Sequence, residues 1–308
     1  MSDGERRLLG VSSIDAWLDR FAGWRIDPDD EASPRRPLVM GVLNVTPDSF
    51  SDGGKYLKGY AATGRAATLE REGADILDVG GESTRPGSEP VDADEQKRRI
   101  LNVIEVAASD LGMVVSVDTS SADVASAALD AGAAIVNDVT AGRGDEAMFD
   151  VMKRARACVL MHMRGTPRTM QAAPAYEDVV GEVEAFLLER AQAAEAAGVE
   201  KRRIVLDPGI GFGKTIEHNL RLLKEIDRFS KHGYPVLLGA SRKRFLGEIT
   251  GEPDAAGRDD ATTATTCWGI TRGVSIVRVH DVRAARHAVD TTLAIQSAPD
   301  ISNEAGSL

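Results

Sequence analysis

Short apolar runs alternate with longer helix-forming stretches through most of this sequence, and this alternation constrains the fold most strongly. It starts at residue 37 and repeats eight times by residue 296. The runs that we expect to be strands are PLVMGVLNV, ADILDVGG, MVVSVDT, AAIVNDV, ACVLMHM, RIVLDPG, PVLLGAS and SIVRVHD. Eight consecutive βα units over ~250 residues predict an α/β protein, a (β/α)8 or TIM barrel, because right-handed crossovers close such a sheet on itself. Doubly wound sheets usually have fewer units.

The barrel is predicted to span residues 37–296, between an N-terminal extension and linker (1–36) and a C-terminal tail (297–308). In the extension, IDAWLDRFAGW has apolar residues at helical spacing. It predicts an amphipathic helix docked on the barrel, with a partner-binding element as the alternative. Glycines that follow a helical stretch and precede a strand mark the C′ position at which each helix ends. They are Gly73, Gly132, Gly198, Gly233 and Gly273.

Composition limits the classes of function. The chain carries a formal net charge of -11 at pH 7, which argues against a general nucleic-acid or anionic-membrane surface, so we expect neither partner. The first residues, MSDGERRLLGVSS, lack a continuous apolar stretch, and no run of ~18 apolar residues occurs, so we expect neither a leader segment nor a membrane span. The two cysteines, Cys158 and Cys267, argue against a disulfide framework. We therefore expect a cytoplasmic protein that binds any anionic ligand at a focused site.

A polar residue closes each of the eight apolar runs. These residues are Asn44, Glu82, Asp118, Asn137, His162, Asp207, Ser241 and His280. The carboxyl ends of barrel strands meet on one face, where the loops build the active site, so we expect them to form one ring. Each one alone has a second interpretation as a helix N-cap or its neighbour, but capping does not explain all eight.

The polar strand ends separate into acceptors and cations. Asp118, Asn137 and Asp207 would suit the N–H edge of a flat, donor-rich heterocycle, since buried carboxylates need such donors. The basic residues follow strands seven and eight, where barrels of this type often hold a phosphate. They are Arg242, Lys243, Arg244, Arg278 and His280. The sequence therefore predicts a site with a heterocycle end and a phosphate end.

The first strand runs into a loop, MGVLNVTPDSFSDGG, that is rich in turn formers and oxygen-bearing side chains. Pro47 and the glycine pair that follows exclude a helix and favour a long loop. Asn44, with Asp48 and Asp52 beyond it, offers the hard oxygen ligands that Mg²⁺ prefers when it bridges to a phosphate. Zinc is not expected, because the five histidines lack HExxH spacing and the cysteines lie far apart.

The segment DPGIGFGKT looks like a nucleotide-binding glycine loop but lacks its spacing. A Walker motif needs glycine where this chain has Pro208, and GxGxG is not the dinucleotide fingerprint. We expect the glycines to let Asp207 and an exposed Phe212 approach a ligand closely. Lys214 is then expected to be an ordinary surface residue at the start of a helix.

In order and spacing, eight segments of this chain closely resemble the dihydropteroate synthase family of folate biosynthesis, the target of sulfonamides. They are MGVLNVTPDSFSDGG, DVGGESTRPG, SVDT, VND, LMHMRGTP, LDPGIGFGK, GASRKRF and RVHDV, and they span residues 37–295. The resemblance implies a transferase that condenses a dihydropterin methyl diphosphate with 4-aminobenzoate in an SN1-like manner. It also implies Mg²⁺ and a homodimer that uses helices of the later half of the barrel, where Trp268 would suit close packing.

The resemblance further implies roles for individual residues, with Lys243, Asp52 and Asp118 as catalytic. The pterin would be held by Asp118, Asn137, Asp207 and Lys243, with Met161 nearby. The diphosphate would be held by Arg278 and His280, helped by Thr84 and Asn44, and Asn44 would also bind the metal. The aminobenzoate would be enclosed by two loops, with Thr46, Pro47, Asp48, Phe50, Ser51 and Asp52 in one, Ser241, Arg242 and Lys243 in the other, and Phe212 as a wall.

The chemistry supports this interpretation. Diphosphate leaves readily once its charge is neutralised, and the amine of aminobenzoate is itself the nucleophile. The lack of a Ser-His-Asp or Cys-His arrangement is therefore consistent with it. Two alternatives remain at this point: a pterin-binding barrel that transfers a methyl group, and a catalytically silent paralogue. The first would have no use for the basic SRK and RVH segments, and the second would not need every motif position.

Overall fold

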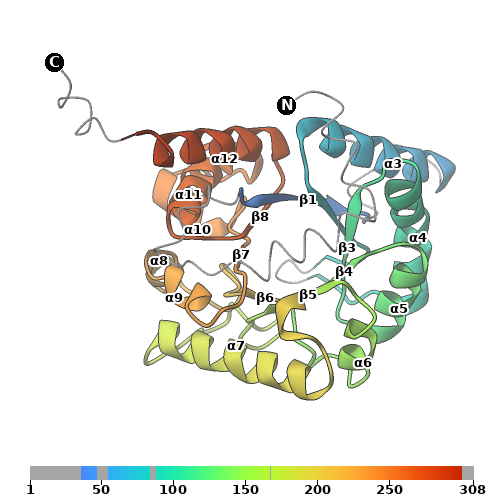
Figure 1. Cartoon of the computed structure of the whole chain (residues 1–308), viewed down its shortest axis with the longest axis horizontal. Helices are drawn as coiled ribbons and strands as arrows, with labels where there is room; N and C mark the ends of the chain where they lie inside the picture. Colours follow the sequence, from blue (N-terminus) through green and yellow to red (C-terminus); the bar gives the residue numbers. More distant parts are fainter. Residues whose placement is uncertain (1–35, 47–54, 84–87, 167, 300–308) are drawn as a thin grey trace.

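Eight parallel strands form a single sheet in the computed structural model, which describes residues 36–46, 55–83, 88–166 and 168–299. The strands are β1 (Leu38–Asn44), β2 (Ile76–Gly80), β3 (Val114–Asp118), β4 (Ile135–Asp138), β5 (Ala157–Met161), β6 (Ile204–Asp207), β7 (Leu237–Leu238) and β8 (Ile276–Val279). Their order is β6-β5-β4-β3-β2-β1-β8-β7, and a bridge between Leu206 and Val236 joins the two outer strands. The predicted (β/α)8 barrel is confirmed (Figure 1).

Helices surround the sheet on its outer side (Figure 1). They are α3 (Lys55–Glu72), α4 (Ala93–Ser109), α5 (Ala122–Asp130), α6 (Met148–Met152), α7 (Val179–Ala196), α8 (Ile216–Lys224), α9 (Asp227–Ser230), α10 (Arg244–Thr250), α11 (Asp259–Thr271) and α12 (Val282–Gln296), with 3-10 turns η2 (Lys201–Arg203) and η3 (Ala256–Arg258). All five glycines predicted to end helices have positive φ, from 77° at Gly233 to 107° at Gly132. This left-handed conformation is the one that a C′ glycine supplies.

Two details of the helices differ from the sequence-based expectation. The stretch predicted as one helix after β6 divides into α8 and α9, because Glu225 leaves helical geometry at φ -110° and ψ 24°. The seven-residue α10 was not among the predicted helices, since a helix of two turns has too few residues to display a hydrophobic period. It begins directly after Lys243 and thereby fixes where the β7 loop ends.

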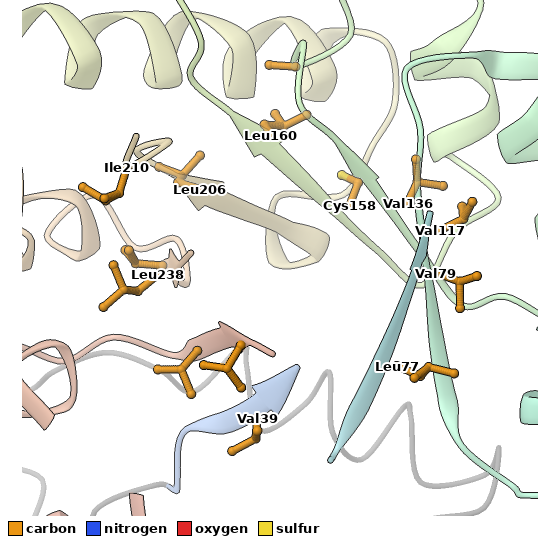
Figure 2. Close-up of a cluster of buried hydrophobic side chains, with 14 of the residues drawn as sticks. Val39, Leu77, Val79, Val117, Val136, Cys158, Leu160, Leu206, Ile210 and Leu238 are labelled. Carbon is orange, nitrogen blue, oxygen red and sulfur yellow. The ribbon is translucent and has the colours of Figure 1, made fainter. Parts of the chain in front are cut away.

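Side chains alternate across each strand and divide the apolar core in two. The outer core joins strand residues such as Val39, Leu77 and Leu160 to helix residues such as Leu69 and Leu187. Figure 2 shows part of this cluster, carried on several strands. The inner core is smaller and fills the barrel with Met40, Ile76, Ala134, Ile135, Ala157, Val159, Val205, Leu237 and Ile276. This packed layer is the floor below the strand ends.

The division of the chain at residues 36 and 297 stays a prediction. The barrel elements run from Leu38 to Gln296. Most of the extension, including the helix expected within residues 14–24, and the end of the tail lie outside the described residues. Within the part that is described, no helix has the length and apolar character needed to span a bilayer.

Candidate active site

A polar layer lies directly above the inner core because the strand period is two. Two residues beyond Ile76, Ile135 and Val205 come Asp78, Asn137 and Asp207, which therefore face the same interior. The same step from Ile276 gives Arg278, and Asp118 pairs in register with Asn137. The barrel interior thus changes from fully apolar to charged within one side-chain layer.

Arg278 lies at the centre of this layer. Its Nε donates to Asp78 Oδ2 at 2.6 Å and its Nη2 donates to Asp118 Oδ2 at 2.7 Å. The amide of Asn137 donates to the same Asp78 oxygen at 3.2 Å. The guanidinium therefore belongs to the acceptor cluster, although the sequence suggested a separate phosphate end.

Asp78 is a site residue that the sequence reasoning missed. It is fully buried, and its ion pair with Arg278 is the only one that involves a completely inaccessible carboxylate among the described residues. The available signal was a charged residue in the middle of the apolar run ILDVG, at a position that faces the interior. A buried carboxylate needs a cation or hydrogen-bond donors to offset its burial, and Asp78 has Arg278 and Asn137.

The electrostatics of the cluster follow from burial. Burial raises the pKa of Asp118 to about 7, because the Arg278 charge that opposes this rise is shared with Asp78. Burial likewise raises the pKa of Asp207 to about 6, although Gly209 N–H donates to this carboxylate at 2.7 Å. For Arg278, burial alone would lower the pKa, but the two carboxylates outweigh it and raise the pKa. Both acids are thus close to titration at neutral pH and would gain from a ligand's N–H donors.

The Lys243 side chain extends over the loop after β6. Its Nζ lies 3.9 Å from the centroid of the Phe212 ring, a cation–π contact. Its stem packs on Gly211, where an added Cβ would lie 2.8 Å from Lys243 Cδ. Phe212 is only 7% exposed, so the expectation of an exposed ring is wrong. The ring packs with Met161, Met163, Met170 and Val139 in a small cluster of its own.

Ser241 and His280 meet at the ends of the last two strands. Ser241 Oγ lies 2.9 Å from His280 Nδ1 and accepts from the His280 backbone N–H at 3.2 Å. The neighbouring Arg242 has φ 57° and directs its guanidinium to Asp259, with two contacts of 2.7 Å. Arg242 therefore ties the β7 loop to α11 in this conformation.

Asn44 and Asp118 flank Gly80, with which both pair in register. A Cβ at Gly80 would lie 3.5 Å from Asn44 Oδ1 and 3.5 Å from Asp118 Cβ, so the glycine leaves the Asn44 oxygen facing the acid. Thr46 follows on the same side and is half-buried. The Asn44 amide oxygen thus lies beside Asp118 at the carboxyl end of β1.

Three other expectations need correction, two for residues at strand ends and one for Lys214 before α8. Glu82 accepts from Val91 N at 3.1 Å and from Gln96 Nε2 at 3.2 Å, so it fixes the start of α4. His162 is buried and contacts Lys214 rather than the central cluster. Lys214 itself is 4% exposed, so it is not a surface residue. The sequence placed it at a helix start, but the tight glycine turns before it direct its side chain inward.

The remaining site residues from the sequence lie outside the described ranges. They are Pro47, Asp48, Phe50, Ser51, Asp52 and Thr84. The structure therefore brings together Asn44, Asp118, Asn137, Asp207 and Arg278, with Lys243, Phe212 and Met161 beside them. In the ranges that are described, no group of three or more histidine, cysteine or acidic side chains forms a protein-only metal site.

Comparisons with known proteins agree with this geometry. The family model described as "Pterin binding enzyme" matches residues 40–280. The dihydropteroate synthase of Mycobacterium leprae is 48% identical over 259 residues, which is 82% of this chain and 90% of that protein.

Solved structures give the same result. The Xanthomonas albilineans dihydropteroate synthase with 4-aminobenzoic acid superposes with a TM-score of 0.81 at 45% identity, over 86% of this chain and 95% of that one. The Yersinia pestis dihydropteroate synthase with a sulfonamide drug superposes with a TM-score of 0.81 at 37% identity, over 85% of this chain and 95% of that one.

A (β/α)8 barrel whose mouth gathers buried acceptors around an arginine, and which matches the family model over most of its length, is a pterin-binding enzyme. Within that class, the chain belongs to the dihydropteroate synthase family.

Proposed function

We propose that this chain condenses (7,8-dihydropterin-6-yl)methyl diphosphate with 4-aminobenzoate to give 7,8-dihydropteroate and pyrophosphate, a step of tetrahydrofolate biosynthesis. The observation that carries the proposal is the cluster of Asp118, Asn137 and Asp207 around Arg278, with Lys243 beside it. In the reaction, the methylene C–O bond breaks with its electron pair going to diphosphate. The amine nitrogen then bonds to the methylene carbon and loses a proton.

The acceptor cluster suits the pterin ring. A pterin presents several N–H donors along one edge, and the buried oxygens of Asp118, Asn137 and Asp207 can accept from them. Such donors would favour the ionised carboxylates and offset the free-energy cost of burying them. Met161, which packs against Phe212, would supply an apolar surface beside the flat ring.

The diphosphate would lie toward Arg278 and His280. Nη1 of Arg278 makes no hydrogen bond within the described ranges, while its other nitrogens hold Asp78 and Asp118. His280 lies two residues further along the same strand direction, hydrogen-bonded to Ser241. Charged donors aimed at the leaving group stabilise the negative charge that grows as the C–O bond breaks. Thr84 would assist from the loop after β2.

Mg²⁺ is proposed as the cofactor, and the donor set fits it. Mg²⁺ commonly takes one or two protein oxygens and completes its shell with substrate phosphate and water. The Asn44 amide oxygen, which has no hydrogen-bond partner in the described part of the chain, supplies one such ligand. When bound, the ion would neutralise charge on the leaving diphosphate. Asp48 and Asp52 of the following loop are the other candidates.

An SN1-like course fits the groups around the reacting carbon. The cation that would form at the methylene is stabilised by its own electron-rich ring and by the nearby carboxylates. No protein nucleophile is then required, and Cys158, the buried thiol nearest in sequence to the site, has its pKa raised to about 12 by burial. Lys243, Asp118 and Asp52 are the proposed catalytic residues.

The aminobenzoate would enter between the Phe212–Lys243 pair and the loops after β1 and β7. The ammonium of Lys243 over the Phe212 ring places a cation where the ligand's carboxylate or its amine would come close. Thr46, Pro47, Phe50 and Ser51 on one side, with Ser241 and Arg242 on the other, would exclude water from the cation. A sulfonamide, which resembles aminobenzoate, would compete there, and the Yersinia pestis relative was solved as a complex with a sulfonamide drug.

We further propose a cytoplasmic homodimer that has only small-molecule substrates as ligands. Cys158 and Cys267 are free thiols, which suits a reducing compartment. Four exposed large apolar side chains lie on helices of the later half: Leu220 on α8, Ile249 on α10, Trp268 on α11 and Ile295 at the end of α12. The first three lie on helices that are in contact, since α10 contacts both α8 and α11. Exposed apolar clusters of this kind favour a protein interface.

Loss of a proposed catalytic residue tests the function. In the presence of Mg²⁺ and both substrates, product formation should fall by about 1,000-fold in Lys243→Ala, because a charged group at the reacting centre is removed. Mass spectrometry of dihydropteroate measures it. Full dihydropteroate synthesis in Lys243→Ala would exclude the role. Transfer of a methyl group to a corrinoid, with no dihydropteroate, would indicate the methyltransferase alternative.

A further inference from the structure

The loop between β6 and α8 is held by a buried lysine that has no part in the mechanism above. Residues 208–214 contain three glycines with positive φ, 65° at Gly209, 85° at Gly211 and 63° at Gly213. Glycine restricts the backbone least, so a loop with three of them needs restraint from outside. This loop carries Phe212 and starts directly after Asp207.

The ammonium of Lys214 supplies the restraint at Gly209 and Phe212, while Asn219, Gln171 and Tyr176 bond the backbone of Gly211 and Gly213. Lys214 Nζ donates to Gly209 O at 2.9 Å and to Phe212 O at 3.0 Å, so it joins the two ends of the turn that presents the Phe212 ring. The third contact is with His162 Nδ1 at 2.9 Å. Burial, followed by the charge of Lys214, lowers the pKa of His162 to about 2, so the ring is neutral and this nitrogen accepts.

All three hydrogen-bond partners of Lys214 are neutral, the side chain is 4% exposed, and burial lowers the pKa of Lys214 to about 7. A buried ion without a directly bonded counter-charge contributes little to stability, and apolar replacements of buried ions are often tolerated. Stability alone therefore does not account for this lysine. Its contacts instead converge on the backbone that places Phe212 under Lys243.

We propose that Lys214 is a positioning residue for the aminobenzoate step, acting through Phe212: by holding the carbonyls of Gly209 and Phe212, it fixes the ring against the Lys243 ammonium. This inference rests on the proposed function, in which Phe212 and Lys243 line the aminobenzoate site. The backbone of Asp207 is fixed by its own strand pairing with β5, and only one bond, from Gly209 N–H, ties its carboxylate to the loop. Loss of Lys214 should thus affect the second substrate far more than the pterin.

The test compares Lys214→Met with Lys224→Met, the same exchange at an exposed lysine of α8. For Lys214→Met, the KM for 4-aminobenzoate should rise about tenfold, while the Kd for the dihydropterin diphosphate with Mg²⁺ changes less than about threefold. Lys224→Met should match the wild type. An unchanged KM, or an equal loss of pterin affinity, would overturn the proposal. If the wild type itself forms no dihydropteroate, the proposed function fails instead.

A double-mutant cycle separates positioning from general loosening of the loop. In a Phe212→Ala background, Lys214→Met should add less than about twofold to the KM, because its route of action is already gone. A full tenfold effect in that background would contradict action through Phe212.

A second pair of variants decides the matter if Lys214→Met does not fold. His162→Leu removes one acceptor of the ammonium, and His162→Asn can supply an oxygen near the former Nδ1. The leucine variant should raise the KM for aminobenzoate about threefold and the asparagine variant should restore it. Equal KM values in both variants would refute the role of Lys214.

Discussion

At the scale of single residues, the site depends on charges that are buried and shared. Arg278 binds two carboxylates at once, and one of them, Asp78, is fully buried. Because two acids share one guanidinium, neither is fully neutralised, and the pKa of Asp118 rises to about 7 through burial. A ligand with N–H donors would supply hydrogen bonds that stabilise the ionised form of these carboxylates. The proposed recognition of a pterin therefore depends on the charge balance of Asp78, Asp118 and Arg278.

Asp78→Asn tests whether the buried acid supports the site. Breaking a buried pair costs ~3 kcal/mol, and the released guanidinium should lose its orientation. We expect a loss of about 3 kcal/mol in the free energy of unfolding, measured in urea, and a Kd for the pterin diphosphate about tenfold higher. Asp130→Asn, at an exposed pair with Arg154, is the control and should cost at most ~1 kcal/mol. Equal effects of the two substitutions would contradict this assignment.

The pH dependence of pterin binding follows from the raised pKa values of Asp207 and Asp118, about 6 and about 7. Pterin N–H groups need ionised acceptors, so affinity should be full above these values and fall as pH decreases through them, with proton release on binding. Calorimetry between pH 5 and 8 in two buffers of different ionisation enthalpy measures both effects. An affinity that stays constant over this range would show that neither acid titrates there.

At the scale of elements, the strands could be predicted from the sequence better than the loops. The eight apolar runs, their polar ends and the helix-ending glycines could be identified because period and C′ geometry are local properties. The position of the Lys214 side chain could not be predicted, since it depends on how the segment DPGIGFGK folds against β5. The helix α10 could not be predicted because it is too short to show a hydrophobic period. The burial of Phe212 could not be predicted for the same reason as the position of Lys214. Three left-handed glycines turn the loop back onto the barrel, and this path is not a local property of the sequence.

Two glycine substitutions separate backbone strain from crowding in that loop. A Cβ at Gly209 would lie 1.9 Å from His162 O, whereas at Gly233 nothing lies within 4 Å, and both have positive φ. Gly233→Ala should therefore cost only ~1 kcal/mol in the free energy of unfolding, while Gly209→Ala should cost at least ~2 kcal/mol more. Urea denaturation gives both values. Similar costs would mean that the loop is not held against β5 as described.

At the scale of the whole molecule, the barrel places chemistry on one face and leaves apolar residues exposed on helices of its later half. Trp268 on α11 is 41% exposed although its indole N–H donates to Leu223 O at 2.7 Å and the Arg272 guanidinium lies over its ring, so the side chain is fixed while part of its surface stays accessible. A rigid, exposed aromatic ring suits an interface between two copies, because little side-chain entropy is lost on association.

Trp268→Glu tests the proposed homodimer. A carboxylate at the centre of an apolar interface would be desolvated without a partner, so the variant should sediment as a monomer at concentrations where the wild type is a dimer. Ile295→Glu, a similar change at the end of α12, is the control and should remain dimeric. Analytical ultracentrifugation distinguishes the two states. A monomeric wild type, or a dimeric Trp268→Glu, would count against this interface.

The most direct test of the account is pyrophosphate release from the dihydropterin methyl diphosphate with Mg²⁺, followed with and without 4-aminobenzoate. We expect aminobenzoate to couple release to the formation of dihydropteroate in equal amounts, and Asp207→Ala to lose both. Pterin diphosphate that binds tightly to the wild type but yields no dihydropteroate would contradict the proposed activity and indicate a pterin-binding protein without synthase function.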